Sequence, residues 1–381
     1  MNSSQSSEFV RIMRPEGSVI YGGGSWGRFH IDLPLFLLLL VLSGVGLFVL
    51  MSASGQDVHY VKRQAVYMGI GLVVMLITAQ VNPRFLQRWA FVPYVMGTAM
   101  LVAVIFVGTG AKGAQRWLDL GVLRFQPSEI LKFAAPLMLA SYLGARNLPP
   151  KFKHLVVSLV ILLVPALLVG MQPDLGTALL IFAAGFFVVF LAGLRKRYIF
   201  SAILGVLALA PLFWFFILHD YQKTRILTML DPQADKLGAG WNIIQSTTAI
   251  GSGGLEGKGW AKGTQSQLDF LPESHTDFII AVLAEEFGLI GVALLTTLYL
   301  LIIGRGLLIS ISAQSMFGRL LAGSITLTFF VYMFVNMGMV SGILPVVGVP
   351  LPFVSYGGTA VVTLMLGFGM LMAVSTEKKR D

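Results

Sequence analysis

Long apolar runs recur along this chain from Leu33 almost to its C-terminus, and they constrain the fold more than any other feature. A run of about 20 residues with few charges is long enough to cross the hydrocarbon core of a bilayer as a helix. Of the 381 residues, 56% are hydrophobic and only 12% are charged, about half the charged share of an average soluble domain. The sequence therefore predicts an all-α integral membrane protein, whose backbone groups are hydrogen-bonded within helices.

We count about ten such runs, which predicts one polytopic bundle of about ten transmembrane helices. The first run lacks a small-residue cleavage site, so we expect it to be a span and not a removed signal peptide. A long connection, residues 219–275, separates the seventh run from the eighth. The expected spans are residues 33–51, 64–81, 90–109, 127–143, 155–170, 175–194, 198–218, 276–304, 317–343 and 352–374.

Basic residues in the short loops determine the expected orientation, because Lys and Arg near span ends are retained in the cytoplasm. The set expected inside is Arg11, Arg14, Arg28, Arg84, Arg88, Arg146, Lys151, Lys153, Arg195, Lys196, Arg197, Arg305, Arg319, Lys378, Lys379 and Arg380. This pattern predicts a protein of the bacterial cytoplasmic (inner) membrane with both termini in the cytoplasm. Residues 1–31 and 376–381 are then cytoplasmic tails, 32–375 the transmembrane domain, and 219–275 a large extracytoplasmic loop.

The charge and the metal-binding residue types exclude several functions. The net charge of +9 reflects the retention pattern and anionic lipid head groups, and it is no evidence for nucleic acid. The chain has no cysteine, so neither a disulfide framework nor a cysteine metal site is expected. Its five histidines form no pair at helical spacing, which argues against a zinc site built from protein ligands.

Acidic residues are distributed unevenly over the expected topology, and the cytoplasmic loops between spans contain none. The acids expected on the outer face are Asp57, Asp119, Asp174, Asp220, Asp231, Asp235, Glu256, Asp269, Glu273 and Asp277. Glu129, Glu285 and Glu286 fall within predicted spans. A substrate site built from carboxylates is therefore expected outside or within the membrane.

Asp277 stands at the expected outer end of the eighth span, in the segment LPESHTDFIIAVLAEEFG of residues 271–288. We expect Thr276 or Ser274 to cap this helix, which places Asp277 in the first turn, where the helix dipole favours a carboxylate. Small residues share its helix face, so Asp277 is expected to point toward the bundle, whereas Glu286 projects the opposite way. The alternative is an ordinary first-turn acid without a ligand.

Charged residues also occur within and above the fourth span, in the segment LRFQPSEILKF. Glu129 and Lys132 are three residues apart and are expected to pair on one helix face. Intramembrane charges are costly and usually face a cavity or a partner. Lys112, Arg116 and Arg124 form an outer basic cluster, which indicates a phosphate site. The alternatives are a purely structural ion pair and a solvated basic face.

Two short segments, QPSE at residues 126–129 and QPDLGT at residues 172–177, place a proline near the start of a span that runs inward. Each presents a helix N-terminus, whose free N–H groups bind anions, to the outer face. We expect Asp174 to cap the second of these helices. Plain helix initiation explains the prolines and Asp174 equally well without a ligand.

The glycine-rich stretch GSGGLEGKGWAKG, residues 251–263, does not match a phosphate-binding P-loop, because its spacing differs and neither Ser nor Thr follows Lys258. We expect a flexible loop that rests on the membrane interface or holds a sugar, with Trp241 and Trp260 as its aromatic residues. The segment VVGVPLPFVSYGG interrupts the chain around the start of the last span, which is typical of backbone that lines a cavity.

Taken together, these segments resemble the SEDS family (shape, elongation, division and sporulation), and most of all its elongation members. The resemblance runs from about Asp32 to the last span, and residues 1–30 fall outside it. The segments that carry it are SASGQ, GAQRWLDLG, RFQPSEILK, QPDLGT, GSGGLEGKGW, GTQSQLDFLPESHTDFI, LAEEFGLIG and GILPVVGVPLPFVSYGG.

The resemblance implies a peptidoglycan glycosyltransferase that polymerises lipid II on the outer face during lateral cell-wall elongation and rod-shape maintenance. In that family the acid of the HTDF motif, here Asp277, is essential. A carboxylate at this position can act as general base on the acceptor sugar hydroxyl while undecaprenyl pyrophosphate leaves the donor. The α-linked donor gives a β-linked product, so we expect inversion without a covalent intermediate.

The remaining site assignments concern the charge of the leaving group. Arg116, Arg124 and Lys132 are candidate pyrophosphate contacts, and Glu129 and Asp174 are expected to hold them in place. No covalently bound cofactor is expected, and a divalent cation, Mg²⁺ or Mn²⁺, is a candidate with unknown ligands. The implied partners are a class B penicillin-binding protein, which is a transpeptidase, other membrane proteins of the elongation complex, and membrane lipid.

Two competing interpretations are a lipid II flippase and a non-catalytic scaffold of the elongation complex. A transporter needs polar access from both faces, whereas the charged groups here crowd the outer face. A scaffold leaves the intramembrane residues Glu129, Lys132 and Glu285 without a purpose. The sequence therefore favours the glycosyltransferase.

Overall fold

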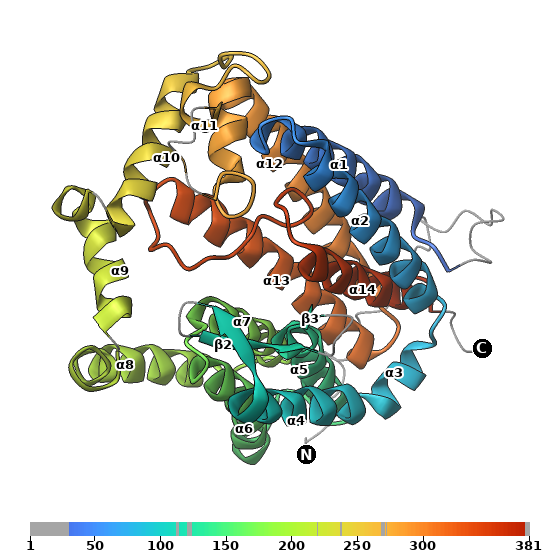
Figure 1. Ribbon diagram of the computed structural model, residues 1–381. Helices are drawn as coiled ribbons and strands as arrows, with labels where there is room; N and C mark the ends of the chain where they lie inside the picture. Colours follow the sequence, from blue (N-terminus) through green and yellow to red (C-terminus); the bar gives the residue numbers. More distant parts are fainter. Residues whose placement is uncertain are drawn as a thin grey trace, which may run out of the picture.

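The computed structural model describes residues 30–111, 114–119, 124–218, 220–236, 238–267, 271 and 273–377. It is a helical bundle (Figure 1) with one small antiparallel sheet, whose strands follow the order β1-β2-β3. The strands are β1 Thr109–Ala111, β2 Ala114–Asp119 and β3 Arg124–Phe125. The helices are α1 Leu33–Ala53, α2 Val58–Ala79, α3 Pro83–Trp89, α4 Phe91–Val107, α5 Pro127–Gly144, α6 Phe152–Gly170, α7 Leu175–Leu191, α8 Lys196–Leu212, π-helix η2 Phe213–Ile217, α9 Asp220–Leu230, 3₁₀-helix η3 Pro232–Asp235, α10 Ala239–Gly253, α11 Thr264–Gln267, α12 Ile279–Ser312, α13 Met316–Val340 and α14 Gly358–Ser375.

Each of the ten predicted spans overlaps at least one helix of the bundle, and span 198–218 overlaps both α8 and η2. By length and composition, seven of the described helices can cross a membrane, or eight if α3 and α4, which meet at a bend of 46°, form one span. Helix α7 is apolar but has only 17 residues, and α5 carries Glu129 and Lys132. The polytopic all-α class is thus confirmed, whereas the count of ten stays a prediction.

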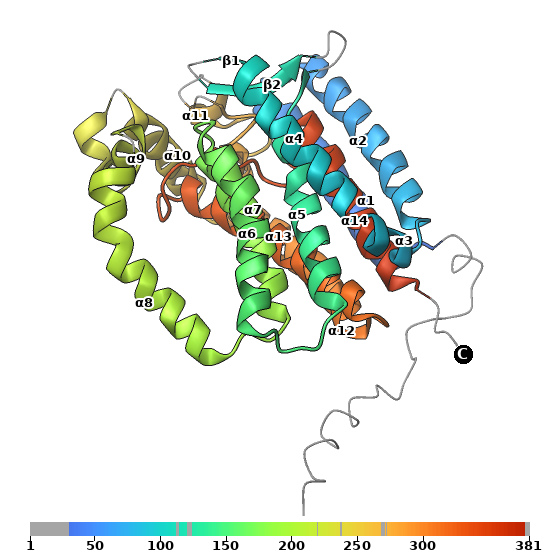
Figure 2. The same cartoon turned by 90° about the horizontal axis from the view of Figure 1, so that it is seen from below.

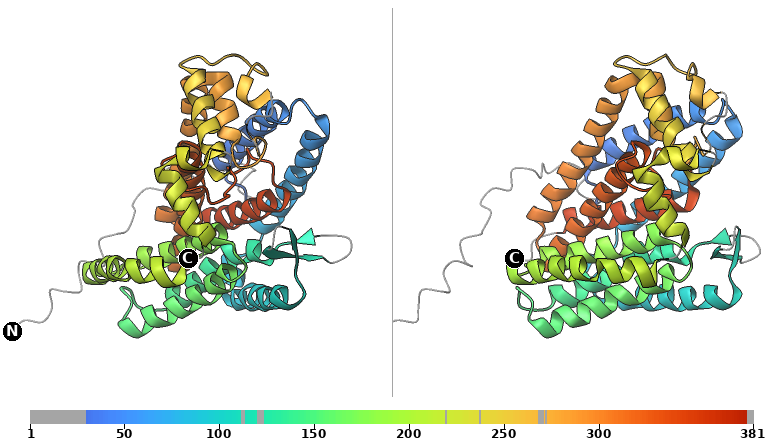
Figure 3. Two further views of the ribbon diagram at one scale, coloured as in Figure 1. Left: turned by 60° about the vertical axis from the view of Figure 1, so that its left-hand side comes forward. Right: turned by 90° about the vertical axis from the view of Figure 1, so that its left-hand side faces the viewer.

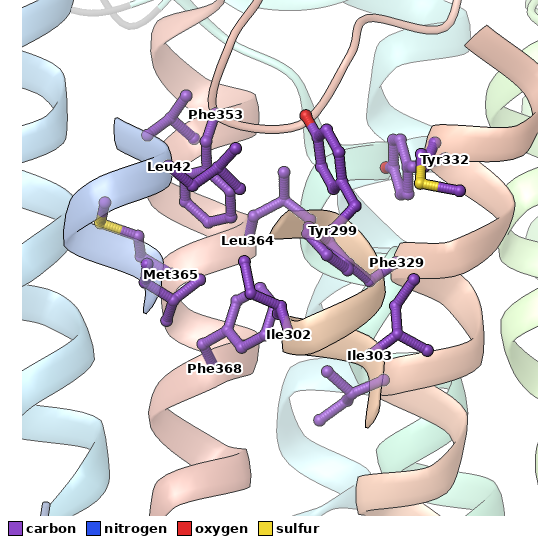
Figure 4. Close-up of a cluster of buried hydrophobic side chains, with 14 of the residues drawn as sticks. Leu42, Tyr299, Ile302, Ile303, Phe329, Tyr332, Phe353, Leu364, Met365 and Phe368 are labelled. Carbon is purple, nitrogen blue, oxygen red and sulfur yellow. The ribbon is translucent and has the colours of Figure 1, made fainter. Parts of the chain in front are cut away.

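Helix α13 lies at the centre of the bundle, packed against α5, α7, α12 and α14. Figure 1 shows α4 to α7 on one side of it and α1, α2 and α14 on the other. Aromatic side chains fill the core beside α13, where the Phe329 and Phe368 ring centroids are 5.0 Å apart (Figure 4). Phe353 enters this core from the segment between α13 and α14, and Tyr299 donates to the Pro352 carbonyl at 2.5 Å. The core therefore anchors the irregular segment 341–357.

Helix α8 runs along the outside of the bundle, beyond α6 and α7 (Figures 2 and 3). None of its described side chains is buried. Water would disfavour such an extended apolar surface, whereas lipid does not. The exposed apolar side chains of α8 thus support a membrane environment.

The start of α1 and the end of α14 meet at one face of the bundle, which we call the terminal face. Asp32 accepts hydrogen bonds from the Arg305 guanidinium at 2.7 and 3.0 Å and from the Ser375 hydroxyl at 2.7 Å. His30 lies 3.1 Å from the Thr376 hydroxyl. Both ends of the described chain are therefore on the same face, as the predicted topology requires.

Helix α12 is broken at Gly288, where the backbone has φ 61° and ψ −160°. Residues 254–259 fill the break, because backbone groups that lose their helical partners need new ones. The N–H groups of Lys258 and Gly259 donate to the carbonyls of Glu285 and Glu286, at 3.0 and 2.9 Å. In return, the N–H groups of Leu289 and Ile290 donate to the carbonyls of Gly254 and Leu255, at 2.9 and 3.1 Å. The glycine-rich stretch is thus a docked structural segment, and our expectation of a flexible loop is wrong.

The break divides α12 into two parts with different surroundings. Residues 279–286 are all buried, whereas exposed leucines and isoleucines begin at Leu289. Helix α12 runs beside α1, from the contact between Phe287 and Phe48 just before the break to the pair of Arg305 with Asp32 in the second part. Only this second part has the exposed apolar surface of a lipid-facing span.

The long connection before α12 is largely helical. It contains α9, η3, α10 and α11, and α10 packs directly against α12. Ser246 in α10 donates to the Val340 carbonyl at the end of α13 at 2.9 Å. This connection is therefore built onto the bundle at the face opposite the terminal face, which we call the site face.

Candidate active site

Asp277 lies on the site face, in a turn formed by residues 273–278 just before α12. The N-cap position of α12 is Phe278, and no side chain caps the helix. Ser274 donates instead to a carbonyl at the end of α1, at 3.2 Å, and Thr276 to an acid of its own turn. Our expectation that Thr276 or Ser274 caps the helix, with Asp277 in its first turn, is wrong.

The backbone around Asp277 is fixed by hydrogen bonds to α13 and to the segment before α14. The Ser355 hydroxyl donates to the Thr276 carbonyl at 2.5 Å, and the Tyr356 N–H donates to the His275 carbonyl at 2.9 Å. The Asn336 amide donates to the carbonyl of Asp277 itself at 2.9 Å. Contacts of this kind hold a functional side chain in a defined place.

The Asp277 carboxylate faces Gly348, where an added Cβ would lie 3.4 Å from Oδ2. Burial, and to a smaller extent the negative charge of Glu273, raises the pKa of Asp277 to about 6, and the positive charge of Arg225 opposes this shift. A carboxylate with such a pKa is a better general base near neutral pH than an ordinary one. Arg225, on α9, was not among the predicted site residues.

Arg116 and Asp174 lie together at the N-terminus of α7. Arg116 donates to the carbonyls of Gln172, at 3.3 Å, and of Pro173, and its Nη1 lies 3.9 Å from Asp174 Oδ2. Asp174 accepts from the Thr177 N–H at 3.2 Å, so the predicted cap of α7 is confirmed. In α7, Pro173 comes before the N-cap residue, whereas Pro127 is the first residue of α5.

The start of α7 and the Asp277 carboxylate flank the same segment of backbone. At Gly176, an added Cβ would lie 2.7 Å from the Val347 carbonyl oxygen. Val347 precedes Gly348, the residue that faces Asp277. The start of α7, which Arg116 contacts, and the Asp277 carboxylate therefore both lie against residues 347–348.

Glu129 and Lys132 form a buried ion pair in α5, with 2.6 Å between Oε1 and Nζ. Thr363 in α14 donates to Glu129 Oε2 at 3.0 Å, and the Lys132 ammonium lies 5.4 Å from the centroid of the Tyr332 ring. The predicted pairing is confirmed. The Lys132 ammonium is already paired with Glu129. A contact between Lys132 and phosphate stays a prediction.

Of the other two members of the outer basic cluster, one is described only by its backbone and one is not described. The backbone of Arg124 lies in β3, paired with β2, but its side chain is outside the described residues. Lys112 also lies outside them. The assignment of Arg124 to pyrophosphate thus stays a prediction.

Glu285 and Glu286 point to different partners. Glu285 accepts from the Lys258 ammonium at 2.8 Å and from the N–H groups of Thr264 and Gln265 at 2.7 and 3.0 Å. Glu286 accepts from a hydroxyl of α1 at 2.5 Å. Glu285 thereby holds the glycine-rich segment in place, so it no longer argues for catalysis.

Metal ligands are not grouped in the part of the chain that the structure describes. No cluster of three or more His, Cys, Asp or Glu residues there is arranged to hold a metal ion. The proposed divalent cation therefore remains without assigned protein ligands.

Comparisons with known proteins agree with the resemblance seen in the sequence. A family model described as cell cycle protein, covering FtsW, RodA and SpoVE, matches residues 32–380. The peptidoglycan glycosyltransferase MrdB of Escherichia coli is 54% identical over 93% of this chain and 96% of its own length.

Solved structures show the same fold. A chain of a peptidoglycan synthase complex, described as coordinating polymerization and crosslinking, matches with a TM-score of 0.81 and 30% identity over 92% of this chain and 99% of its own. The rod shape determining protein RodA of Thermus thermophilus matches with a TM-score of 0.70 and 28% identity, over 92% and 98% of the two chains. The chain therefore belongs to the FtsW, RodA and SpoVE family of cell cycle proteins, which is the SEDS family.

Proposed function

We propose that this chain polymerises lipid II into glycan strands during lateral cell-wall elongation, with Asp277 as the general base. The chain is a peptidoglycan glycosyltransferase, the activity for which its relative at 54% identity is named. The observation that carries the assignment of the base is the placement of Asp277, whose raised pKa and fixed backbone suit proton transfer.

The reaction proposed here is the one that the family resemblance implies, with Asp277 as the base. The Asp277 carboxylate takes the proton of the acceptor sugar 4-hydroxyl while that oxygen attacks the anomeric carbon of the donor. The bond from this carbon to the pyrophosphate oxygen breaks, and undecaprenyl pyrophosphate leaves with the bonding electrons. One displacement inverts the anomeric configuration, so no covalent intermediate forms.

The leaving group carries negative charge that the site must stabilise. Arg225 acts electrostatically on the Asp277 carboxylate, and Arg116 lies at the N-terminus of α7, which contributes the positive end of a helix dipole. Arg124 and Lys132 are further candidates, with Glu129 and Asp174 positioning the basic groups. A divalent cation, Mg²⁺ or Mn²⁺, would supply additional charge stabilisation.

The partner inferred for this chain is a class B penicillin-binding protein that crosslinks the new strands. The likeness to a chain of a synthase complex that couples polymerization to crosslinking supports this inference. Other membrane proteins of the elongation complex would bind the same assembly.

The decisive test is a reconstitution of the purified chain with labelled lipid II and no other polymerase. We expect glycan strands, resolved as a ladder on a gel. Translocation of lipid II across the vesicle membrane without strands would support a flippase. The absence of both strands and translocation would support a scaffold. Either outcome would contradict the proposal. The same measurement is repeated with the transpeptidase partner added, because the enzyme is expected to work in a complex.

In the orientation that we propose, the site face lies on the outer side of the inner membrane and the terminal face on the cytoplasmic side. Lys236 is exposed at the end of η3 on the connection between α8 and α12. Because the chain has no cysteine, a Lys236→Cys variant has a single thiol. We expect this thiol to react with a membrane-impermeant reagent on intact spheroplasts.

The matched control is Gln314→Cys, at an exposed position between α12 and α13 and next to Ser315, which bonds Glu377 near the end of the described chain. This thiol should react only after lysis. The reverse labelling pattern would put Asp277 on the cytoplasmic side and rule out lipid II polymerisation there.

A further inference from the structure

Asn336 lies on α13 directly behind the Asp277 turn, and its side chain is completely buried. Its amide nitrogen donates two hydrogen bonds, one to the Asp277 carbonyl at 2.9 Å and one to the Val349 carbonyl at 2.8 Å. One side chain therefore ties the turn that carries the acid to the segment that passes in front of it.

Two carbonyl oxygens at one position require an uncharged group with two N–H donors. Neutral histidine, serine and threonine each supply one donor, and a lysine or arginine would bring a buried charge. The Asn336 Oδ1 atom has no hydrogen-bond partner among the described residues. Rotating the amide would turn this oxygen toward two carbonyl oxygens, so the neighbours determine which amide atom faces them.

The two carbonyls belong to the two backbone segments that meet at the Asp277 carboxylate. One is its own backbone carbonyl, and the other lies one residue beyond Gly348, which faces Oδ2. A shift of either segment would change the distance between the carboxylate and Gly348, and with it the position of the base. Catalytic geometry tolerates displacements of about 1 Å poorly, at a cost that can reach about 100-fold in rate.

We propose that Asn336 is a positioning residue for glycosyl transfer, which holds the Asp277 carboxylate in place by fixing the two backbone segments that meet at it. This inference rests on the proposed function, in which Asp277 is the base. A purely structural residue would stabilise the bundle by the same bonds without affecting proton transfer. Rate measurements as a function of pH separate the two roles.

The test compares Asn336→Leu with Ser324→Ala in otherwise full-length protein. Leucine has nearly the shape of asparagine but donates no hydrogen bond. Ser324 is buried on the same helix and donates to the Ala184 carbonyl of α7 at 2.7 Å, away from Asp277. Both variants thus lose buried hydrogen bonds from α13, and only the first loses those that hold the site.

For Asn336→Leu we expect kcat for lipid II polymerisation to fall about 10- to 100-fold, with KM changed by less than about threefold, the mark of an interaction that matters in the transition state. The acid limb of the profile of kcat against pH should also move to lower pH. Burial raises the pKa of Asp277, so a carboxylate that loosens and gains contact with water should have a lower pKa. The other charged groups that act on Asp277, Glu273 and Arg225, are unchanged. Ser324→Ala should lower the melting temperature while kcat and its pH profile stay unchanged.

If Asn336→Leu does not fold, Asn336→Ser supplies a smaller residue with one donor, and the same shift of the acid limb is expected. A variant with the wild-type kcat and pH profile would overturn the positioning role. The proposed function is tested separately by Asp277→Asn. An inactive Asp277→Asn with an unaffected Asn336→Leu contradicts only the role of Asn336, whereas an active Asp277→Asn contradicts the base.

Discussion

Asp277→Asn is expected to lower lipid II polymerisation by roughly two to four orders of magnitude, the usual contribution of a positioned acid or base. Asparagine keeps the size of the side chain but cannot take the proton of the acceptor hydroxyl. Folding should persist, because Asp277 caps no helix and the bonds of its turn to Ser355, Tyr356 and Asn336 use backbone carbonyls. The measurement is the initial rate of strand formation by purified variants at equal protein levels.

The pH profile supplies the control for this assignment. The base must be deprotonated, so with a pKa of about 6 the wild-type rate should fall as the pH drops through this value. Glu273→Gln removes a negative charge that raises the pKa of Asp277, and should therefore move the acid limb to lower pH while leaving the plateau largely intact. An Asp277→Asn enzyme that polymerised lipid II at the wild-type rate would exclude Asp277 as the base.

The parts of the fold that follow from local patterns were predictable from the sequence. Apolar runs locate the helices, because each span must satisfy its own backbone hydrogen bonds in lipid. The spacing of Glu129 and Lys132 predicts their pairing, since residues three apart share a helix face. Asp174 caps α7 as its residue type favours. In all three cases the partners are close in sequence.

Contacts between distant segments account for what the sequence did not show. At Asp277, the backbone bonds from Ser355 and Tyr356 impose a turn where a capped helix start was expected. Residues 254–259 look like a flexible loop until the break of α12 at Gly288 provides partners for their backbone. No periodicity in the sequence indicates which glycine breaks a helix or which loop fills the break.

The same limit applies to the candidate site. Asp277 was identified through its motif, but Arg225 and Asn336 act on it from α9 and α13, about 50 to 60 positions away along the chain. Glu285 shows the converse case. As an acid in an apolar run it suggests function, and the structure explains it by its bonds to Lys258, Thr264 and Gln265.

Removal of the Lys132 ammonium should have the second large effect, on folding and activity together. In Lys132→Ala, the buried Glu129 carboxylate keeps the Thr363 hydroxyl but loses its counter-charge at 2.6 Å. Breaking a buried pair in this way typically costs about 3–5 kcal/mol, so we expect a lower yield of folded protein and a lower melting temperature in detergent.

The double variant Glu129→Gln/Lys132→Met removes both charges and should recover most of the stability. If it recovers the polymerisation rate as well, the pair is structural, whereas a folded but inactive double variant supports contact of Lys132 with the leaving pyrophosphate. Wild-type yield and rate in both Lys132→Ala and Glu129→Ala would show that the pair matters for neither.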